Sequence, residues 1–133
     1  MSSNKTHIKT VYGPKADGQL INDTGATLPV GVSADRFSPY QMLLGALSYC
    51  LYLTHVSLAE KMAVEHTEVV VDVTGTKRDA KVSTLEHVMV DVVGKGVTDQ
   101  KKFERAFEIA TRYCSVFNTI SQVAKIEWNI SYE

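Results

Sequence analysis

An uncharged apolar segment constrains the fold of this chain more than any other feature. Residues Phe37 to Ala59 contain no Asp, Glu, Lys or Arg. On a helix, the apolar side chains of this segment point around the whole circle, a pattern typical of a helix buried on all sides. Ser38, Pro39 and Gln41 predict an N-cap, a proline at the first helical position and a capping box. We therefore expect a long buried helix that begins here.

The length and composition of the chain predict one core. A chain of 133 residues with 44% hydrophobic content fits a single domain over residues 1–133. A helix of about twenty residues is about 30 Å long, which is the diameter of a small domain. Because one subunit has too little sheet to cover all sides of such a helix, we predict a homodimer. Five residues interrupt the apolar segment and argue against a membrane span: Gln41, Ser48, Thr54, His55 and Ser57.

The charge of the chain excludes some partners. Fourteen basic and fifteen acidic residues give a net charge of -1, so no field favours nucleic acid or an anionic membrane. The segment Met1 to Lys5 lacks the apolar stretch of a signal peptide. We therefore expect a cytoplasmic protein with no nucleic-acid or membrane partner, whose two cysteines are reduced at rest.

The order of the elements predicts an α+β fold. Alternation of apolar and polar residues and a helical stripe of apolar residues distinguish the strands from the helices. Strands are expected at 5–12 and 19–22, after the turn 23–25, at 67–74, at 87–92 and at 125–132, with a turn at 75–79. Helices are expected from Thr98 or Asp99 to Cys114 and near 115–123. Strands and helices in separate blocks favour antiparallel pairing with the helices on one face.

The chemistry of the chain depends on its two cysteines. Cys50 lies in the apolar segment, and Cys114 closes the apolar stripe of the later helix, so both thiols are expected inside the protein. Two buried thiols are either inert packing residues or a protected redox pair. His55 is about 140° around the helix from Cys50, so it is poorly placed as a base for that thiol. No histidine pair has the spacing of metal ligands, and we expect no metal and no cofactor.

Two segments carry a resemblance to a known family. Residues 38–50 resemble the helix signature of the OsmC/Ohr family, the osmotically induced and organic hydroperoxide resistance proteins. Residues 114–120 resemble its second cysteine motif, usually Cys-Pro followed by Asn-Thr-Leu. The resemblance implies an OsmC-like fold with antiparallel sheets packed on a long buried central helix. It also implies an intertwined homodimer with active sites at the subunit interface.

The resemblance further implies a thiol peroxidase active in oxidative stress defence. Cys50 would be the peroxidatic thiolate that attacks an organic hydroperoxide, and Cys114 the resolving thiol that forms a disulfide with it. The apolar helix would line a pocket that suits alkyl or fatty hydroperoxides. A dithiol donor, which the family takes from lipoylated proteins, would reduce the disulfide.

The chain departs from the family in the groups that activate the thiolate. Family members with peroxidase activity carry a glutamate after the helix-start proline, where this chain has Tyr40. That glutamate pairs with an arginine whose charge stabilises the thiolate, and tyrosine cannot form the ion pair. Arg36 is our candidate for the cation, and Lys15 is the second choice.

A second function therefore stays open. The chain would then be a dimeric OsmC-like binding module that holds a hydrophobic or acyl ligand in an apolar pocket, without peroxidase activity. Tyr40 favours this alternative. The two cysteines in matching motifs favour the peroxidase, because a binding pocket needs no second thiol.

Overall fold

The computed structural model describes residues 4–133 and divides the chain into two compact units, residues 1–43 and 44–133. The first unit holds an antiparallel sheet of β1 (Lys9–Tyr12), β2 (Gly18–Ile21) and β3 (Thr27–Val30) in the order β1-β2-β3. The first strand is shorter than the predicted 5–12. The β2–β3 turn is closed by Asn22, whose Oδ1 accepts hydrogen bonds from the N–H groups of Thr24 and Ala26.

Helix α1 (Pro39–Lys61) begins where the sequence predicts. The Ser38 N–H donates to Gln41 Oε1 at 2.9 Å, and the Gln41 N–H donates to Ser38 Oγ at 3.3 Å. These two bonds are the reciprocal pair of a capping box, and they satisfy two of the N–H groups that a helix start leaves without intrahelical partners. The predicted helix start is confirmed.

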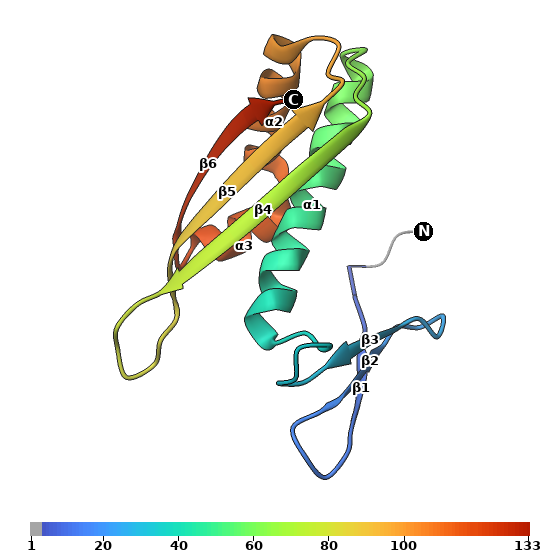
Figure 1. Cartoon of the computed structure of the whole chain (residues 1–133), viewed down its shortest axis with the longest axis vertical. Helices are drawn as coiled ribbons and strands as arrows, with labels where there is room; N and C mark the ends of the chain where they lie inside the picture. Colours follow the sequence, from blue (N-terminus) through green and yellow to red (C-terminus); the bar gives the residue numbers. More distant parts are fainter. Residues whose placement is uncertain (1–3) are drawn as a thin grey trace. The chain divides into compact units, whose positions relative to one another are not determined.

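The second unit is built on a sheet of β4 (Glu68–Lys77), β5 (Leu85–Lys95) and β6 (Lys125–Tyr132), with helices α2 (Gln100–Tyr113) and α3 (Ser115–Ser121) between β5 and β6. In Figure 1 the helices of this unit lie on one face of the sheet. β4 and β5 are antiparallel, but β5 and β6 are parallel. The prediction of antiparallel pairing throughout is therefore wrong for β6, because the α2–α3 crossover returns the chain to the starting end of β5.

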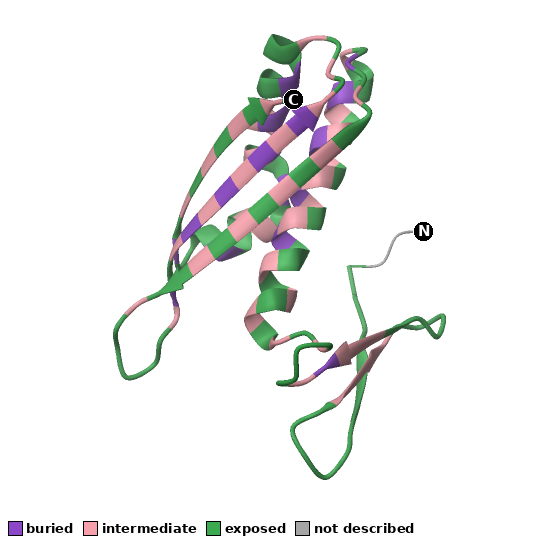
Figure 2. Cartoon of the chain, viewed as in Figure 1, coloured by how far each residue is buried: buried purple, intermediate pink, exposed green. Residues whose placement is uncertain are grey.

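Two sequence patterns determine the core of the second unit. Alternate residues of β5 are buried, as Figure 2 shows in purple, and they face the apolar stripe of α2. Asp99 caps α2 by accepting a hydrogen bond from the Lys102 N–H. The predicted amphipathic helix and final strand are confirmed. The buried residues that form this core include Val88, Val90 and Val92 of β5 and Phe103, Ala106, Phe107 and Ala110 of α2.

Helix α1 departs from the prediction of burial on all sides. Its buried residues form a single stripe, namely Leu47, Leu51, His55 and Ala59. Tyr49 remains 64% exposed and Leu53 47% exposed. One chain supplies a sheet and two helices to only one side of α1, so the other side stays uncovered. By length and composition α1 is also long enough to cross a membrane, a criterion that the core helix of a soluble protein meets as well.

The hairpin between β4 and β5 is longer than predicted. Residues 75–79 were expected to form a turn, but β4 continues to Lys77, and Gly75 pairs with Val88. A Cβ on Gly75 would lie 2.9 Å from a side-chain atom of Leu85 and 3.2 Å from one of Leu44. This glycine therefore leaves room for core side chains instead of turning the chain.

Candidate functional site

The two cysteines come from different helices of the second unit. Cys50 lies in the middle of α1. Cys114 is at once the C-cap of α2 and the N-cap of α3, with an extended backbone at φ -70° and ψ 115°. Its N–H donates to the Ala110 carbonyl at 2.8 Å, and its Sγ accepts a hydrogen bond from the Phe117 N–H at 3.4 Å. A single residue thus ends one helix, begins the next and carries a thiol at the junction.

Asn118 fixes this junction. Its side-chain amide donates to the Arg112 carbonyl at 3.0 Å and to the Cys114 carbonyl at 2.9 Å. The hydroxyl of the next residue, Thr119, donates to the Ser115 carbonyl at 2.9 Å. These bonds satisfy carbonyls where α2 ends and α3 begins. The Asn-Thr pair of the second cysteine motif therefore holds the backbone that surrounds the Cys114 thiol.

The structure brings the two free thiols close enough that each shifts the pKa of the other. Cys114 is fully buried, whereas Cys50 is only partly buried, which corrects the prediction that both thiols lie inside. Cys50 Sγ also lies 4.0 Å from the hydroxyl oxygen of Ser115. Cys50 is therefore the more exposed of the two cysteines.

The environment shifts the pKa values of the two thiols in opposite directions. Burial raises the pKa of Cys50, but hydrogen bonds from the Val116 N–H, the Cys114 thiol, and the Ser115 hydroxyl and N–H outweigh it, so the pKa is lowered. Burial and the neighbouring Cys50 thiolate together raise the pKa of Cys114 to about 11, although the Phe117 N–H opposes the shift. Cys50 is therefore the thiol that ionises first, and Cys114 stays protonated and donates to it.

Sequence reasoning missed the donors in this site. It searched for a cation near Cys50, but the hydrogen bonds that lower the pKa of Cys50 come from neutral groups of residues 114–116. Ser115, Val116 and Asn118 were visible in the second cysteine motif, but no sequence pattern indicates that residues 114–116 lie against α1. The positions of the two motifs in the sequence do not reveal that they are in contact in the fold.

The other predicted site residues belong to the first unit. The Arg36 guanidinium donates through Nη1 to the Gly18 carbonyl at 2.9 Å and to the Val30 carbonyl at 3.3 Å. Its Nη2 lies 3.9 Å from Asp17 Oδ2. Tyr40 is the second residue of α1 and is half-buried, and Lys15 is exposed in the β1–β2 turn. The roles of Arg36, Tyr40 and Lys15 toward Cys50 remain predictions.

His55 is held in the core. Its Nε2 donates to the Phe103 carbonyl at 3.1 Å, and its ring packs edge-on against Phe103 and Phe107 with centroid distances of 4.3 and 5.4 Å. Burial lowers the pKa of His55, the Phe103 carbonyl partly opposes this, and the charge of His66 lowers it further. His55 Nε2 is therefore occupied by the Phe103 carbonyl, and no hydrogen bond joins His55 to Cys50 among the described residues.

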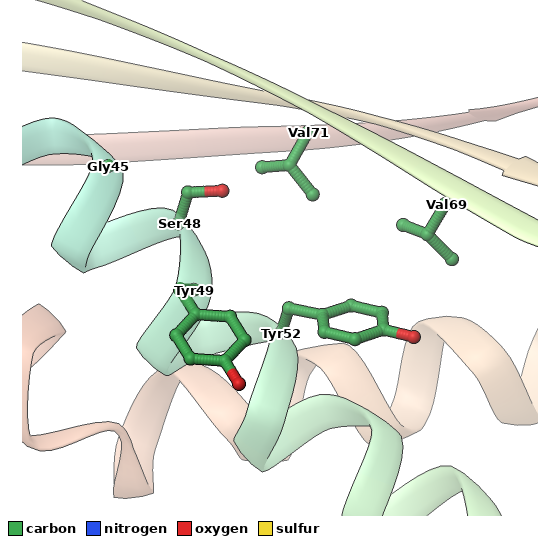
Figure 3. A pocket seen from close by; sticks show the side chains of 6 residues that line it. All are labelled: Gly45, Ser48, Tyr49, Tyr52, Val69 and Val71. Atoms are coloured by element: carbon green, nitrogen blue, oxygen red, sulfur yellow. The ribbon is translucent and has the colours of Figure 1, made fainter. Parts of the chain in front are cut away.

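Hollows outside the thiol site are present in both units. A pocket of about 260 Å³ lies between α1 and β4 and is lined by Gly45, Ser48, Tyr49, Tyr52, Val69 and Val71. Figure 3 shows the valines pointing from β4 toward the helix, and the Tyr52 hydroxyl is 3.2 Å from His66 Nε2. A hollow of about 320 Å³ in the first unit is mostly apolar and includes Phe37 and Met42. Neither lining includes a cysteine. Within residues 4–133, no group of three or more His, Cys, Asp or Glu side chains is placed to hold a metal ion.

Comparison with known proteins relates this site to one family. The sequence model described as OsmC-like protein matches residues 32–129, which contain both cysteines. An OsmC-like protein from Mycoplasma pneumoniae superposes with a TM-score of 0.86 at 18% identity, with 98% of this chain and 99% of that chain covered. None of the curated proteins compared with the chain matches it.

Two solved structures whose names include organic hydroperoxide resistance protein are also similar. That of Legionella pneumophila has a TM-score of 0.71 at 15% identity and covers 98% of this chain and 99% of its own. OhrB of Bacillus subtilis has a TM-score of 0.69 at 15% identity and covers 94% of this chain and 98% of its own. At these identities the similarity shows a shared α+β fold with two sheets and helices. By its family match over residues 32–129, this chain belongs to the OsmC-like protein family.

Proposed function

We propose that this protein is a thiol-dependent peroxidase that reduces organic hydroperoxides. The observation that carries the proposal is the Cys50–Cys114 pair, in which a partly exposed thiol of lowered pKa neighbours a buried thiol of raised pKa. A peroxidatic thiol must be a thiolate at neutral pH, and a resolving thiol must lie within reach of it. Similar structures named organic hydroperoxide resistance proteins support the substrate class.

In this proposal each thiol has one role. The Cys50 thiolate attacks the distal oxygen of the hydroperoxide, a sulfur–oxygen bond forms as the oxygen–oxygen bond breaks, and the alkoxide takes up a proton and leaves as the alcohol. Cys50 is then a sulfenic acid. The Cys114 sulfur attacks it, a disulfide forms, and the sulfenic oxygen leaves as water. A dithiol, of lipoyl or similar type, restores both thiols through two exchange steps.

The proposed assembly and compartment follow from the same features. We propose that the protein acts as a homodimer, because the uncovered side of α1 exposes Tyr49 and Leu53. The cytosol is the proposed compartment, because reduced thiols persist there and a dithiol donor is at hand.

Single-turnover oxidation of the reduced protein tests the proposal. The thiols are counted after one equivalent of cumene or tert-butyl hydroperoxide at neutral pH, with hydrogen peroxide in parallel. We expect the wild type to lose two thiols. Cys50→Ser should lose none, and Cys114→Ser should accumulate a sulfenic acid that dimedone traps. Ser at position 114 is a favoured N-cap, so this variant should keep the α2–α3 junction.

A second function has two specific observations in its favour. Tyr40 stands where active family members carry a glutamate, and the pocket between α1 and β4 is lined largely by aromatic and aliphatic side chains. The chain would then be a binding module for a hydrophobic or acyl ligand. Thiol loss no faster than that of Cys50→Ser would refute the peroxidase and leave this alternative.

A further inference from the structure

Ser115 sets this chain apart from the cysteine motif that it resembles. The motif usually has proline after its cysteine, and proline has neither an N–H nor a hydroxyl to donate. Here Ser115 presents both at the junction of α2 and α3, and its hydroxyl oxygen lies 4.0 Å from Cys50 Sγ. The side chain is exposed, so its hydroxyl is free to turn toward the sulfur.

We propose that Ser115 holds the Cys50 thiolate through its hydroxyl and its N–H, in place of the glutamate–arginine pair that Tyr40 cannot form. The importance of Ser115 for turnover rests on the proposed peroxidase function, but the effect of Ser115 on the Cys50 thiol does not. Both Ser115 groups contribute to the lowered pKa of Cys50. Within residues 44–133 the other groups acting on this thiol are the Val116 N–H and Cys114, and Cys114 is the titratable one.

The backbone around Ser115 is fixed before any substrate binds. Thr119 holds the Ser115 carbonyl, and Asn118 holds the Cys114 carbonyl from two directions, through its N–H at 3.0 Å and its side-chain amide at 2.9 Å. Donors that are held in place stabilise a charge without paying for reorganisation when it forms. A sulfur anion at position 50 therefore meets a backbone that is already in place, and only the Ser115 hydroxyl has to turn toward it.

The test is the pH profile of Cys50 alkylation by iodoacetamide, read by mass spectrometry of the Cys50 peptide, so no peroxide is needed. Ser115→Ala removes the hydroxyl and keeps the N–H, whereas Ser115→Pro removes both. Proline fits this position, because Cys114 already has the extended backbone that a residue before proline prefers and Ser115 is the first residue of α3. Ser121→Ala is the matched control, since its hydroxyl donates to the Asn118 carbonyl in the same helix.

We expect the alkylation midpoint to rise by about half a pH unit in Ser115→Ala, a threefold loss of thiolate, and by more in Ser115→Pro. Ser115→Thr should restore the midpoint, and Ser121→Ala should leave it unchanged. Unchanged midpoints in both Ser115→Ala and Ser115→Pro would overturn the proposal. A shifted midpoint in a protein that consumes no hydroperoxide would instead refute only the peroxidase function.

Discussion

His55 makes the stability of this protein depend on pH. The buried ring donates to the Phe103 carbonyl and has a lowered pKa, so the folded protein resists protonation of this side chain. The unfolded chain takes up the proton near pH 6.5, the ordinary value. Below pH 6.5 the unfolded state therefore binds more protons than the folded state. The contribution of His55 to the free energy of unfolding is complete above pH 6.5 and decreases as the pH drops below it. The slope reaches at most about 1.4 kcal/mol per pH unit, and the loss between pH 8 and pH 5 at most about 2 kcal/mol.

Urea unfolding of wild type and His55→Gln from pH 5 to pH 8, at one protein concentration, measures this slope. Glutamine keeps an N–H donor for the Phe103 carbonyl but cannot be protonated in this range. The variant should lose stability at pH 8 and show a flatter pH dependence than the wild type. His87→Gln is the matched control, because it removes a partly exposed histidine paired with Glu127. Equal slopes in wild type and His55→Gln would refute a buried neutral His55.

Two further variants test the local structure. Asp99→Ala removes the N-cap of α2, whose carboxylate accepts a hydrogen bond from the Lys102 N–H at 3.0 Å. The variant should lower the free energy of urea unfolding by about 1 kcal/mol. No change in this free energy would refute the role of Asp99 as a cap. Gly96→Ala places a Cβ at φ 65° and 2.7 Å from Thr67 Oγ1, and should cost about 1 to 3 kcal/mol in thermal unfolding. Gly25→Ala, at φ 95° in open space, should cost less; equal losses would refute the clash.

Local patterns were the part of the fold that the sequence could predict. The capping box at Ser38 and Gln41, the cap at Asp99 and the alternation in β5 each depend on residues within a few positions of one another. Gly75 was misread, because a glycine that turns the chain and one that leaves room for Leu85 look the same in sequence. The direction of β6 was also misread, since its pairing depends on how α2 and α3 cross the sheet.

The thiol site was predictable only as far as its two cysteines. Their motifs identified Cys50 and Cys114, and the structure places these thiols close enough to shift each other's pKa. The donors were not predictable, because the contact between α1 and residues 114–116 depends on the packing of helices far apart in the chain. A search for charged residues also overlooks neutral N–H and hydroxyl groups, which are present at most positions of any sequence.

The parallel pairing of β5 and β6 sets an order of assembly. The β4–β5 hairpin closes a short loop, from Lys77 to Leu85, and such contacts form early because little chain entropy is lost. β6 can join only after α2 and α3 have crossed the sheet. We therefore expect pulse-labelled hydrogen exchange during refolding to protect β4 and β5 before β6, and simultaneous protection would contradict this order. Since Cys114 lies in that crossover, a partly folded chain would hold Cys50 without its partner thiol and would be open to irreversible oxidation.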